Sequence, residues 1–506
     1  MSSSREKHQI GALAAVAYCA GDMIGSGIFI SPTAILSHTG SVALSLIVWV
    51  ACAVIAVVGA LVYIELGTSI RRSGCDFAYL SHAEWHFLAV AFLWVGVVIQ
   101  SPCVLAIQST ALSQNIVGGV QIYYHMNAGL QYLLEKLIAI AVLLLLGLLN
   151  MFSLKQWASK FQIVAFTAKI LTTILIIGAG IYYIAFQEKY KSFNDAFENS
   201  TKNPGEIVLA LYAGLFAYEG WCILNYGLEE IANPKRVLPI AALGGIGISA
   251  TVYVLMNVSY FALLTVDEFK SSDAVAVAFS KKALSGFAPV LPFLIALLLL
   301  SNLNTTIFSG SRHLLAGAQR RVAPTVFSLI DQSSGSPRIA IVTELVFGVA
   351  MLFAGDLSRL ISYMTFAGML ERVSVVLALF YMRYKKTPMH PEGIRYPIIL
   401  PLLFLCINIT LLVIPLILDF TVALYGLAAV FFGLLVYFLF IFPNQLPMWL
   451  MKMDEGVSNV VQRIFGLEPS AFIPDECVKE GEDQSYNCES CDAITDCNST
   501  THCIRF

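Results

Sequence analysis

Charged residues are scarce in this sequence. Asp, Glu, Lys and Arg make up 12% of its 506 residues, against about a quarter in soluble globular proteins. Apolar residues make up 58% of the chain, and the mean hydropathy is +0.76. The chain has too little polar surface for a soluble fold, so we expect most of it to lie in lipid.

A basic excess is also missing. The 30 basic residues are balanced by 33 acidic ones, and the net charge of -3 provides no positive surface for a nucleic acid partner. The acidity is concentrated in residues 443–506, which hold eleven acidic and four basic residues. No small-residue cleavage site precedes the first apolar stretch, so we predict a retained span and not a signal peptide.

Patterns typical of metal sites and enzymes are weak. Five of the eleven cysteines lie in the tail, at Cys477, Cys488, Cys491, Cys497 and Cys503. Only Cys488 and Cys491 form a C-x-x-C motif, and the others are irregularly spaced. That spacing is poor evidence for zinc, and free or palmitoylated thiols are favoured. No His, Asp or Cys constellation assembles at membrane depth, so we expect no metal, no cofactor and no enzymatic activity.

Long apolar stretches dominate what is present. A membrane-crossing helix needs roughly 20 apolar residues, and twelve such stretches follow one another between residues 9 and 442. The sequence therefore predicts an all-α polytopic membrane protein with twelve transmembrane helices. We expect these parts: N-terminus 1–8, spans 1–5 in 9–186, an outside loop 187–206, spans 6–10 in 207–383, spans 11–12 in 396–442, and a tail 443–506.

The short loops indicate the orientation. Lys and Arg gather in alternate loops, which the positive-inside rule assigns to the cytoplasm, and an even number of spans then places both termini there. The loop 187–206 would lie outside. It contains Asn199 in an Asn-Ser-Thr triplet, which makes Asn199 a glycosylation candidate.

Two spans are interrupted by glycine and polar residues. Span 1 contains Gly21, Gly25, Ser26 and Gly27 at a depth where a helix should be continuous. Small residues four apart can simply be a helix contact, and that reading remains open. Span 6 has a second interruption at 214–221, and two broken helices five spans apart are typical of an inverted five-helix repeat.

Unwound backbone at membrane depth is tolerated only where it lines a cavity, because its N–H and C=O groups need partners. Free amides at Gly25, Ser26 and Gly27 would bind a carboxylate at the positive end of the following half-helix. Carbonyls near Phe216, Ala217 and Glu219 would bind an ammonium group. The pair of breaks therefore suits a zwitterion.

At these residues the chain resembles the light-chain amino acid transporters, the L-type or heteromeric branch of the amino acid, polyamine and organocation superfamily. The matching motifs extend over most of 9–440 at 24–29 (IGSGIF), 63–67 (YIELG), 73–79 (SGCDFAY), Lys169, 214–218 (GLFAY), 229–230 (EE), 233–234 (NP), 238–239 (LP), 272–277 (SDAVAV) and 311–312 (SR). The resemblance implies a leucine-transporter-type fold of five plus five inverted helices and two extra, working by alternating access.

The resemblance also implies roles for single residues. Met23, Ser26 and Gly27 would contact the substrate carboxylate, and Phe216 and Ala217 the ammonium. Phe216 would act as an outer gate, although an ordinary core or lipid-facing aromatic is the alternative. Lys169 stands alone in the apolar run of span 5, where the family's matching lysine occupies the sodium site of relatives. This implies sodium-independent exchange, unless Lys169 reaches the interface instead.

Two departures from the family concern charge. Glu219 stands where the family usually has Gly, Ser or Ala, and a carboxylate there would accept a cationic substrate side chain unless it is already paired within the protein. Glu371 and Arg372 in span 10 replace polar or aromatic residues. Charges at membrane depth are costly unless paired, so these two would pair with each other or with Asp22, and the sequence leaves the choice open.

The remaining expectations concern partners and location. Residues 112–135 contain no cysteine, so we expect no disulfide-linked heavy chain, although noncovalent binding stays open. The chain ends Ile504-Arg505-Phe506, which could add as a strand to a PDZ domain. We predict a plasma-membrane, sodium-independent exchanger of neutral L-amino acids, which would also accept cationic ones if Glu219 is unpaired. The alternative is an amino acid receptor with the same fold that senses without appreciable flux.

Overall fold

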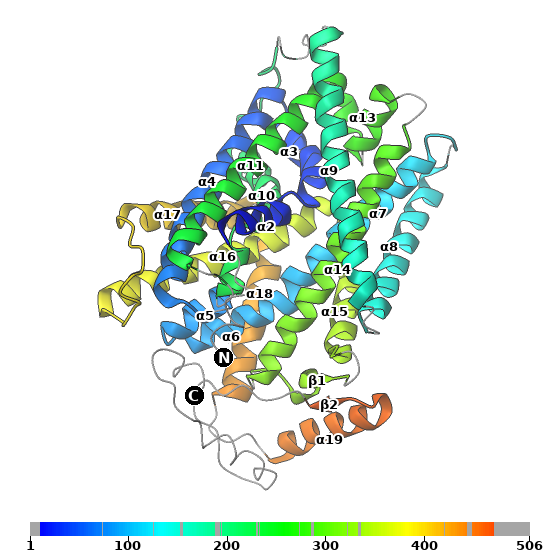
Figure 1. Cartoon of the computed structure of the whole chain (residues 1–506). Helices are drawn as coiled ribbons and strands as arrows, with labels where there is room; N and C mark the ends of the chain where they lie inside the picture. The colour runs from blue at the N-terminus through cyan, green and yellow to red at the C-terminus, as the bar shows by residue number, and fades with distance from the viewer. Residues whose placement is uncertain are drawn as a thin grey trace.

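The computed structural model describes residues 11–469, apart from short gaps (Figure 1). The gaps are at 73, 125, 152–154, 188–192, 194, 229–230, 232, 273, 285–287, 321, 332–334, 419 and 443–447. The cysteine-containing end of the tail and the PDZ candidates Ile504, Arg505 and Phe506 therefore lie outside the described residues.

The described chain is almost entirely helical. Its first half contains α2 (Ala12–Met23), α3 (Gly27–Thr39), α4 (Val42–Ile70), α5 (Cys75–His82), α6 (His86–Val95), the π-helical turn η2 (Gly96–Gln100), α7 (Ser101–Val120), α8 (Ala128–Met151), α9 (Lys155–Phe186), α10 (Pro204–Ala217) and the 3-10 turn η4 (Ile223–Tyr226). The second half contains α11 (Pro234–Leu263), α12 (Val266–Lys270), α13 (Val275–Ala283), α14 (Val290–Gln319), η7 (Thr325–Ser328), β1 (Leu329–Ile330), α15 (Arg338–Met351), α16 (Leu357–Lys385), α17 (Ile399–Leu418), α18 (Phe420–Val436), η8 (Tyr437–Ile441), α19 (Met448–Phe465) and β2 (Glu468–Pro469).

Side-chain caps start several of the long helices. Ser41, Asn203, Asn233 and Asp356 each accept a hydrogen bond from a backbone N–H in the first turn of α4, α10, α11 and α16. Such caps satisfy amides that a helix start leaves without an acceptor. Proline follows both asparagines as the first helical residue, where its missing N–H has no intrahelical partner to lose.

The apolar helices confirm an all-α polytopic membrane protein. Among the described residues, nine helices are long and apolar enough to cross a bilayer, and α2 with α3 forms one further, bent span. The helices of spans 6 and 9, α10 and α15, have 14 residues each, which is shorter than a full crossing needs. The predicted total of twelve spans therefore stays a prediction.

Both predicted helix breaks are present. In span 1, α2 and α3 meet at a bend of 49° across residues 24–26. In span 6, α10 ends at Ala217 and the chain continues through turns into η4. The reading of span 1 as a continuous helix with packing glycines is therefore wrong, because the backbone leaves helical geometry at Ile24.

Helices five spans apart lie against each other. The second half of span 1, α3, contacts α10 of span 6, α4 of span 2 contacts α11 of span 7, and α7 of span 3 contacts α14 of span 8. Equivalent helices of two inverted halves meet in this way around a central axis. The contacts thus agree with the repeat that the resemblance implies.

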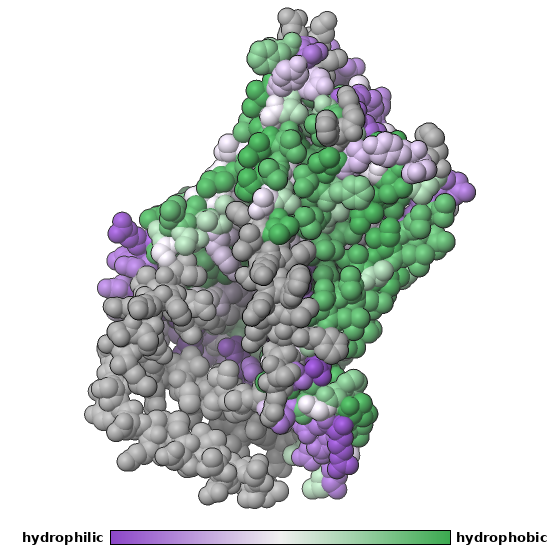
Figure 2. Space-filling view, turned by 45° about the vertical axis from the view of Figure 1, so that its right-hand side comes forward, coloured by the Kyte–Doolittle hydropathy of each residue, from purple (hydrophilic) through white to green (hydrophobic). Residues whose placement is uncertain are grey.

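The outer surface suits lipid. Figure 2 shows a broad hydrophobic surface over the bundle, with hydrophilic residues near its two ends. Large apolar side chains are exposed along α8, at Leu130, Leu133, Leu137, Leu144, Leu145 and Leu148. A soluble protein rarely exposes so large an apolar surface, whereas a bilayer stabilises it.

The end of the molecule that carries α5 and α19 is tied together by polar contacts (Figure 1). Glu65 of α4 is buried and binds the Arg383 guanidinium of α16 at 2.5 and 2.6 Å. It also accepts from the Tyr396 amide at 3.1 Å. On the surface of the same region, Arg71 pairs with Glu392 at 3.0 Å. The segment between α16 and α17 is therefore fixed to the end of α4.

Helix α19 is attached to this end by its polar side. The hydroxyl of Thr325, at the start of η7, donates to Asp454 at 2.7 Å and lies 2.8 Å from the Ser458 hydroxyl. Beyond the helix, β2 pairs antiparallel with β1. These contacts position the described part of the tail against the loop between α14 and α15.

Span 3 contains the π-helical turn η2. Its last residue, Gln100, donates a side-chain N–H to the Glu371 carboxylate of α16 at 2.9 Å. The next residue, Ser101, donates its hydroxyl to Glu344 of α15. Turns of this kind are often found at functional sites, and here two successive side chains reach two different helices.

Candidate functional site

The break in span 1 leaves backbone amides without acceptors. The amide of Ile24 still donates to Ala20 at 2.9 Å, and that of Gly25 donates to the Met23 carbonyl at 2.6 Å. No described residue accepts from the amides of Ser26 and Gly27. These groups lie at the N-terminal end of α3, where the helix dipole favours an anion.

The two broken helices touch at a glycine. A Cβ atom added to Gly27 would lie 2.9 Å from Ala217 Cβ and 3.3 Å from Ala217 N, and it would be closer still to Ala217 Cα. Ala217 is the last residue of α10, and it is buried together with Phe216. The predicted carboxylate and ammonium residues are therefore brought together at one contact.

Tyr253 of α11 joins the same two breaks. Its buried hydroxyl lies within hydrogen-bond distance of the carbonyls of Met23 and Ala217, the latter at 2.8 Å, and its one proton is shared between them. The Ala217 carbonyl, predicted to face an ammonium group, has a hydrogen-bond donor from the protein itself. The sequence analysis missed Tyr253, because a tyrosine in an apolar helix resembles any other membrane aromatic.

Polar side chains of the scaffold helices approach the break in span 1. Gln108 of α7 donates to the Ser26 hydroxyl at 3.4 Å, and its own carbonyl accepts from Thr306 of α14 at 3.2 Å. Gln108 is buried, so this chain of contacts fixes the Ser26 side chain. Spans 3 and 8 thus support the proposed carboxylate site.

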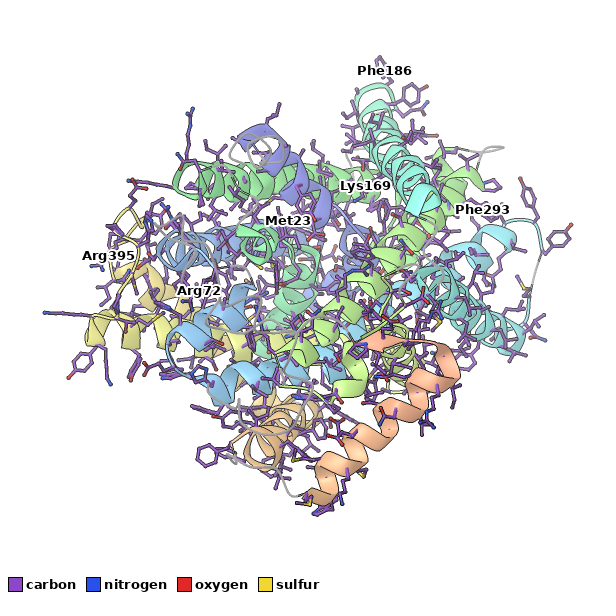
Figure 3. The ribbon with its side chains drawn as sticks, turned by 60° about the horizontal axis from the view of Figure 1, so that its bottom comes forward. Met23, Arg72, Lys169, Phe186, Phe293 and Arg395 are labelled. Carbon is purple, nitrogen blue, oxygen red and sulfur yellow. The ribbon has the colours of Figure 1, made fainter. Side chains whose placement is uncertain are left out.

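Lys169 reaches the other half of span 1. Its ammonium group donates to the Gly21 carbonyl at 2.7 Å, near the C-terminal end of α2, where the helix dipole favours a cation. Figure 3 labels Lys169 on α9 and Met23 at the end of α2. Lys169 therefore faces into the protein, and the alternative of a lysine that reaches the interface is wrong.

Glu219 already has a partner. The Arg372 guanidinium of α16 binds its two carboxylate oxygens at 2.6 and 2.5 Å, and it lies 5.6 Å from the centre of the Trp221 ring. Of the two alternatives for Glu219, the structure favours the internally paired carboxylate. The expected pairing of Arg372 with Glu371 or Asp22 does not occur among the described contacts.

A cavity opens beside this ion pair. Its empty volume is about 520 Å³ including open solvent, and its wall includes Phe216, Glu219, Glu371, Arg372, Tyr63 and Asp76. The wall therefore combines the end of α10 with charged groups of α5 and α16 next to Phe216.

The predicted glycosylation site, Asn199, does not line this cavity. Asn199 is exposed, with a left-handed backbone φ of 60°, in the loop before α10. Its neighbour Thr201 donates an amide to Thr39 at the end of α3. Asn199 is thus accessible to a modifying enzyme, and its glycosylation stays a prediction.

Most of the chain is similar in sequence to known proteins. The model of the amino acid permease family matches residues 10–451. "Amino acid transporter protein 6" of Caenorhabditis elegans is 39% identical over 88% of this chain and 85% of its own length. The human "Cystine/glutamate transporter" is 31% identical over 92% of this chain and 91% of its own. The human "b(0,+)-type amino acid transporter 1" is 31% identical over 92% and 94%.

Proposed function

Because this chain belongs to the amino acid permease family, it is an amino acid transporter, and we propose that it is a sodium-independent exchanger of neutral L-amino acids. Alternating access would carry the substrate past the breaks of spans 1 and 6. The relatives above are named as transporters, so the alternative of a receptor without flux has no support. For the same reason, the family is one of transporters and not of enzymes.

The contact between the two breaks carries this proposal. The unpaired amides of Ser26 and Gly27 would bind the substrate carboxylate at the positive end of α3, with Gly25 and Met23 beside them. The ammonium group would lie near the end of α10, at Phe216 and Ala217. Phe216 lines the cavity and would separate the bound substrate from solvent as a gate.

The position of the Lys169 ammonium group supports a transport cycle without sodium. Its ammonium occupies the space next to the Gly21 carbonyl, and a fixed cation there would repel a metal cation. Lys169 would thus stabilise the end of α2 without a bound ion. Replacing it with alanine should impair exchange with or without sodium in the medium.

Acceptance of cationic amino acids would depend on Glu219. A lysine or arginine substrate would have to compete with Arg372 for the Glu219 carboxylate, because one guanidinium nitrogen of Arg372 already donates to both oxygens. We therefore rank neutral substrates first. Unchanged arginine uptake in Glu219→Ala would exclude Glu219 as a substrate-binding residue.

We also propose a cellular setting for the chain. Both termini would face the cytoplasm of a plasma-membrane protein, with Asn199 outside. The absence of cysteine from residues 112–135 argues against a disulfide-linked heavy chain. The C-terminal Ile504, Arg505 and Phe506 would bind a PDZ scaffold, and one residue added after Phe506 should abolish capture by such a domain.

Transport in purified proteoliposomes tests the central proposal. Vesicles loaded with an unlabelled neutral amino acid should take up a labelled panel of amino acids at equal rates in sodium and in potassium buffer. Empty vesicles should show little uptake. A requirement for sodium, or equal uptake into loaded and empty vesicles, would contradict sodium-independent exchange.

A further inference from the structure

The cavity beside Phe216 contains more acid than base. Its lining includes three carboxyl groups, on Glu219, Glu371 and Asp76, and one guanidinium group, on Arg372. Arg372 is bound to both oxygens of Glu219. Among the described residues, no Lys, Arg or His forms an ion pair with Glu371 or Asp76. Two carboxyl groups therefore remain without a compensating cation.

These two carboxyl groups also have few hydrogen bonds. One oxygen of Glu371 accepts from Gln100 at 2.9 Å. Asp76 is only 9% exposed, and its Oδ1 atom has no hydrogen-bond partner. The hydroxyl of Tyr63, 2% exposed, makes no hydrogen bond of good geometry either, but Tyr63 and Cys75 lie near enough to Asp76 for weak hydrogen bonding to its carboxyl group. Ionised carboxylates are costly to bury without a cation or donors, so this site favours added positive charge.

The surrounding charges do not remove that cost. Three charged groups act on Glu371: Asp76 from α5, Glu219 from the turn after α10, and Arg372 next to it on α16. Two of them are negative, and the positive one is already paired. Burial raises the pKa of the Asp76 carboxyl, which lies on α5 outside the spans, to about 6.

The neutral polar groups around the site come from several helices. Tyr63 belongs to α4 and Cys75 to α5, whereas Cys222 and Tyr226 follow α10. Thiols and phenols carry no charge near neutral pH, so these groups offer hydrogen bonds and not compensation. They leave the charge of the two carboxyl groups unchanged.

A second cavity meets the first at the same two carboxyl groups. It has an empty volume of about 260 Å³ including open solvent, and Asp76, Glu371 and Tyr226 line both cavities. Its wall also includes His313 of α14 and residues of α5 and α6, which lie toward the end of the molecule that carries α19 (Figure 1). Asp76 and Glu371 thus stand between the substrate cavity and that end.

We propose that Asp76 and Glu371 form a proton-binding site that loads and empties with the transport cycle. A proton from water would bind one carboxylate oxygen and give a neutral carboxyl group, and it would return to water when the cavity opens on the other side. Amino acid movement would then carry protons and depend on pH. This inference rests on the proposed transport function, because the site would open and close with the substrate cavity.

The test uses the full chain in proteoliposomes that contain a pH-sensitive dye and a neutral amino acid. With the medium more acidic than the interior, adding external leucine should acidify the interior of wild-type vesicles. In Glu371→Gln and in Asp76→Asn, the substrate-dependent acidification should be lost, whereas labelled leucine should still exchange with the internal amino acid.

Glu344→Gln is the matched control. Glu344 is also a buried carboxyl group, 5% exposed, and it accepts from Ser101, but it lies on α15 and lines neither cavity. This variant should retain the full proton signal. If Glu371→Gln does not yield folded protein, Asp76→Asn alone decides between the outcomes.

Three results would overturn the proposal. The first is labelled leucine exchange in wild-type vesicles without any substrate-dependent acidification. The second is loss of the proton signal in Glu344→Gln with retention in the two cavity variants. The third is loss of lysine uptake alone in those variants, which would show that the carboxylates bind a substrate side chain. A failure of leucine exchange itself would instead contradict the proposed function.

Discussion

The contact between Gly27 and Ala217 gives the sharpest test of the two-break architecture. In Gly27→Ala, the new methyl group would lie 2.9 Å from Ala217 Cβ, whereas carbon atoms in contact prefer about 3.5–4.0 Å. The two helices would have to separate by roughly 1 Å. Overpacking of this kind costs about 1–3 kcal/mol.

The cost should appear in substrate binding, because the same contact aligns the carboxylate and ammonium sites. A loss of about 1–3 kcal/mol corresponds to roughly five- to 150-fold weaker affinity. Binding of labelled leucine to the purified protein measures it directly, with the thermal unfolding midpoint recorded in parallel. Gly21→Ala is the control, since a Cβ at Gly21 meets nothing within 4 Å. Equal affinities for the two variants would refute the reasoning.

Three further predictions concern hydrogen bonds and ion pairs. Tyr253→Phe removes the donor that joins the two breaks and should cost about 0.5–1.5 kcal/mol of stability, seen as a lower unfolding midpoint; an unchanged midpoint would exclude the bridge. Glu65→Gln breaks a buried pair and should cost about 3–5 kcal/mol, whereas Glu392→Gln, in the exposed pair of the same region, should leave the unfolding midpoint nearly unchanged. A double-mutant cycle with Glu219→Gln and Arg372→Met should give a coupling energy of about 0.5–3 kcal/mol, and additive effects would argue against the pair.

The breaks of spans 1 and 6 were predictable because they contain residues that disfavour a helix at a membrane depth where the backbone should be helical. Gly25, Ser26 and Gly27 lower helix stability in the one region where lipid most strongly enforces helical hydrogen bonding. A sequence can therefore show where backbone groups must find partners outside the helix. The sequence does not show which residue supplies these partners. Tyr253 supplies one, but it belongs to an apolar span whose sequence contains no helix-breaking residues around it that would single it out.

The pairing of Arg372 was mispredicted for a geometric reason. Neighbours in sequence point in directions about 100° apart on an α-helix, so Glu371 and Arg372 do not face each other. Arg372 turns toward Glu219, and Glu371 turns toward Gln100. Helical geometry alone could have excluded the adjacent pair. The choice of Glu219 as partner depends on how α10 and α16 pack, which the sequence does not reveal.

The π-helical turn η2 has a consequence for how span 3 can evolve. Such a turn amounts to one extra residue accommodated within a helix, so the helix on either side keeps its original facing. Shortening the chain by one residue there would restore ordinary winding without rotating α6 against α7. Only local contacts would be lost, because Gln100 and Ser101 could no longer hydrogen-bond to α16 and α15 at the same time. A related protein that lacks Glu371 or Glu344 could therefore lose the extra residue of η2 with little effect on the packing of span 3.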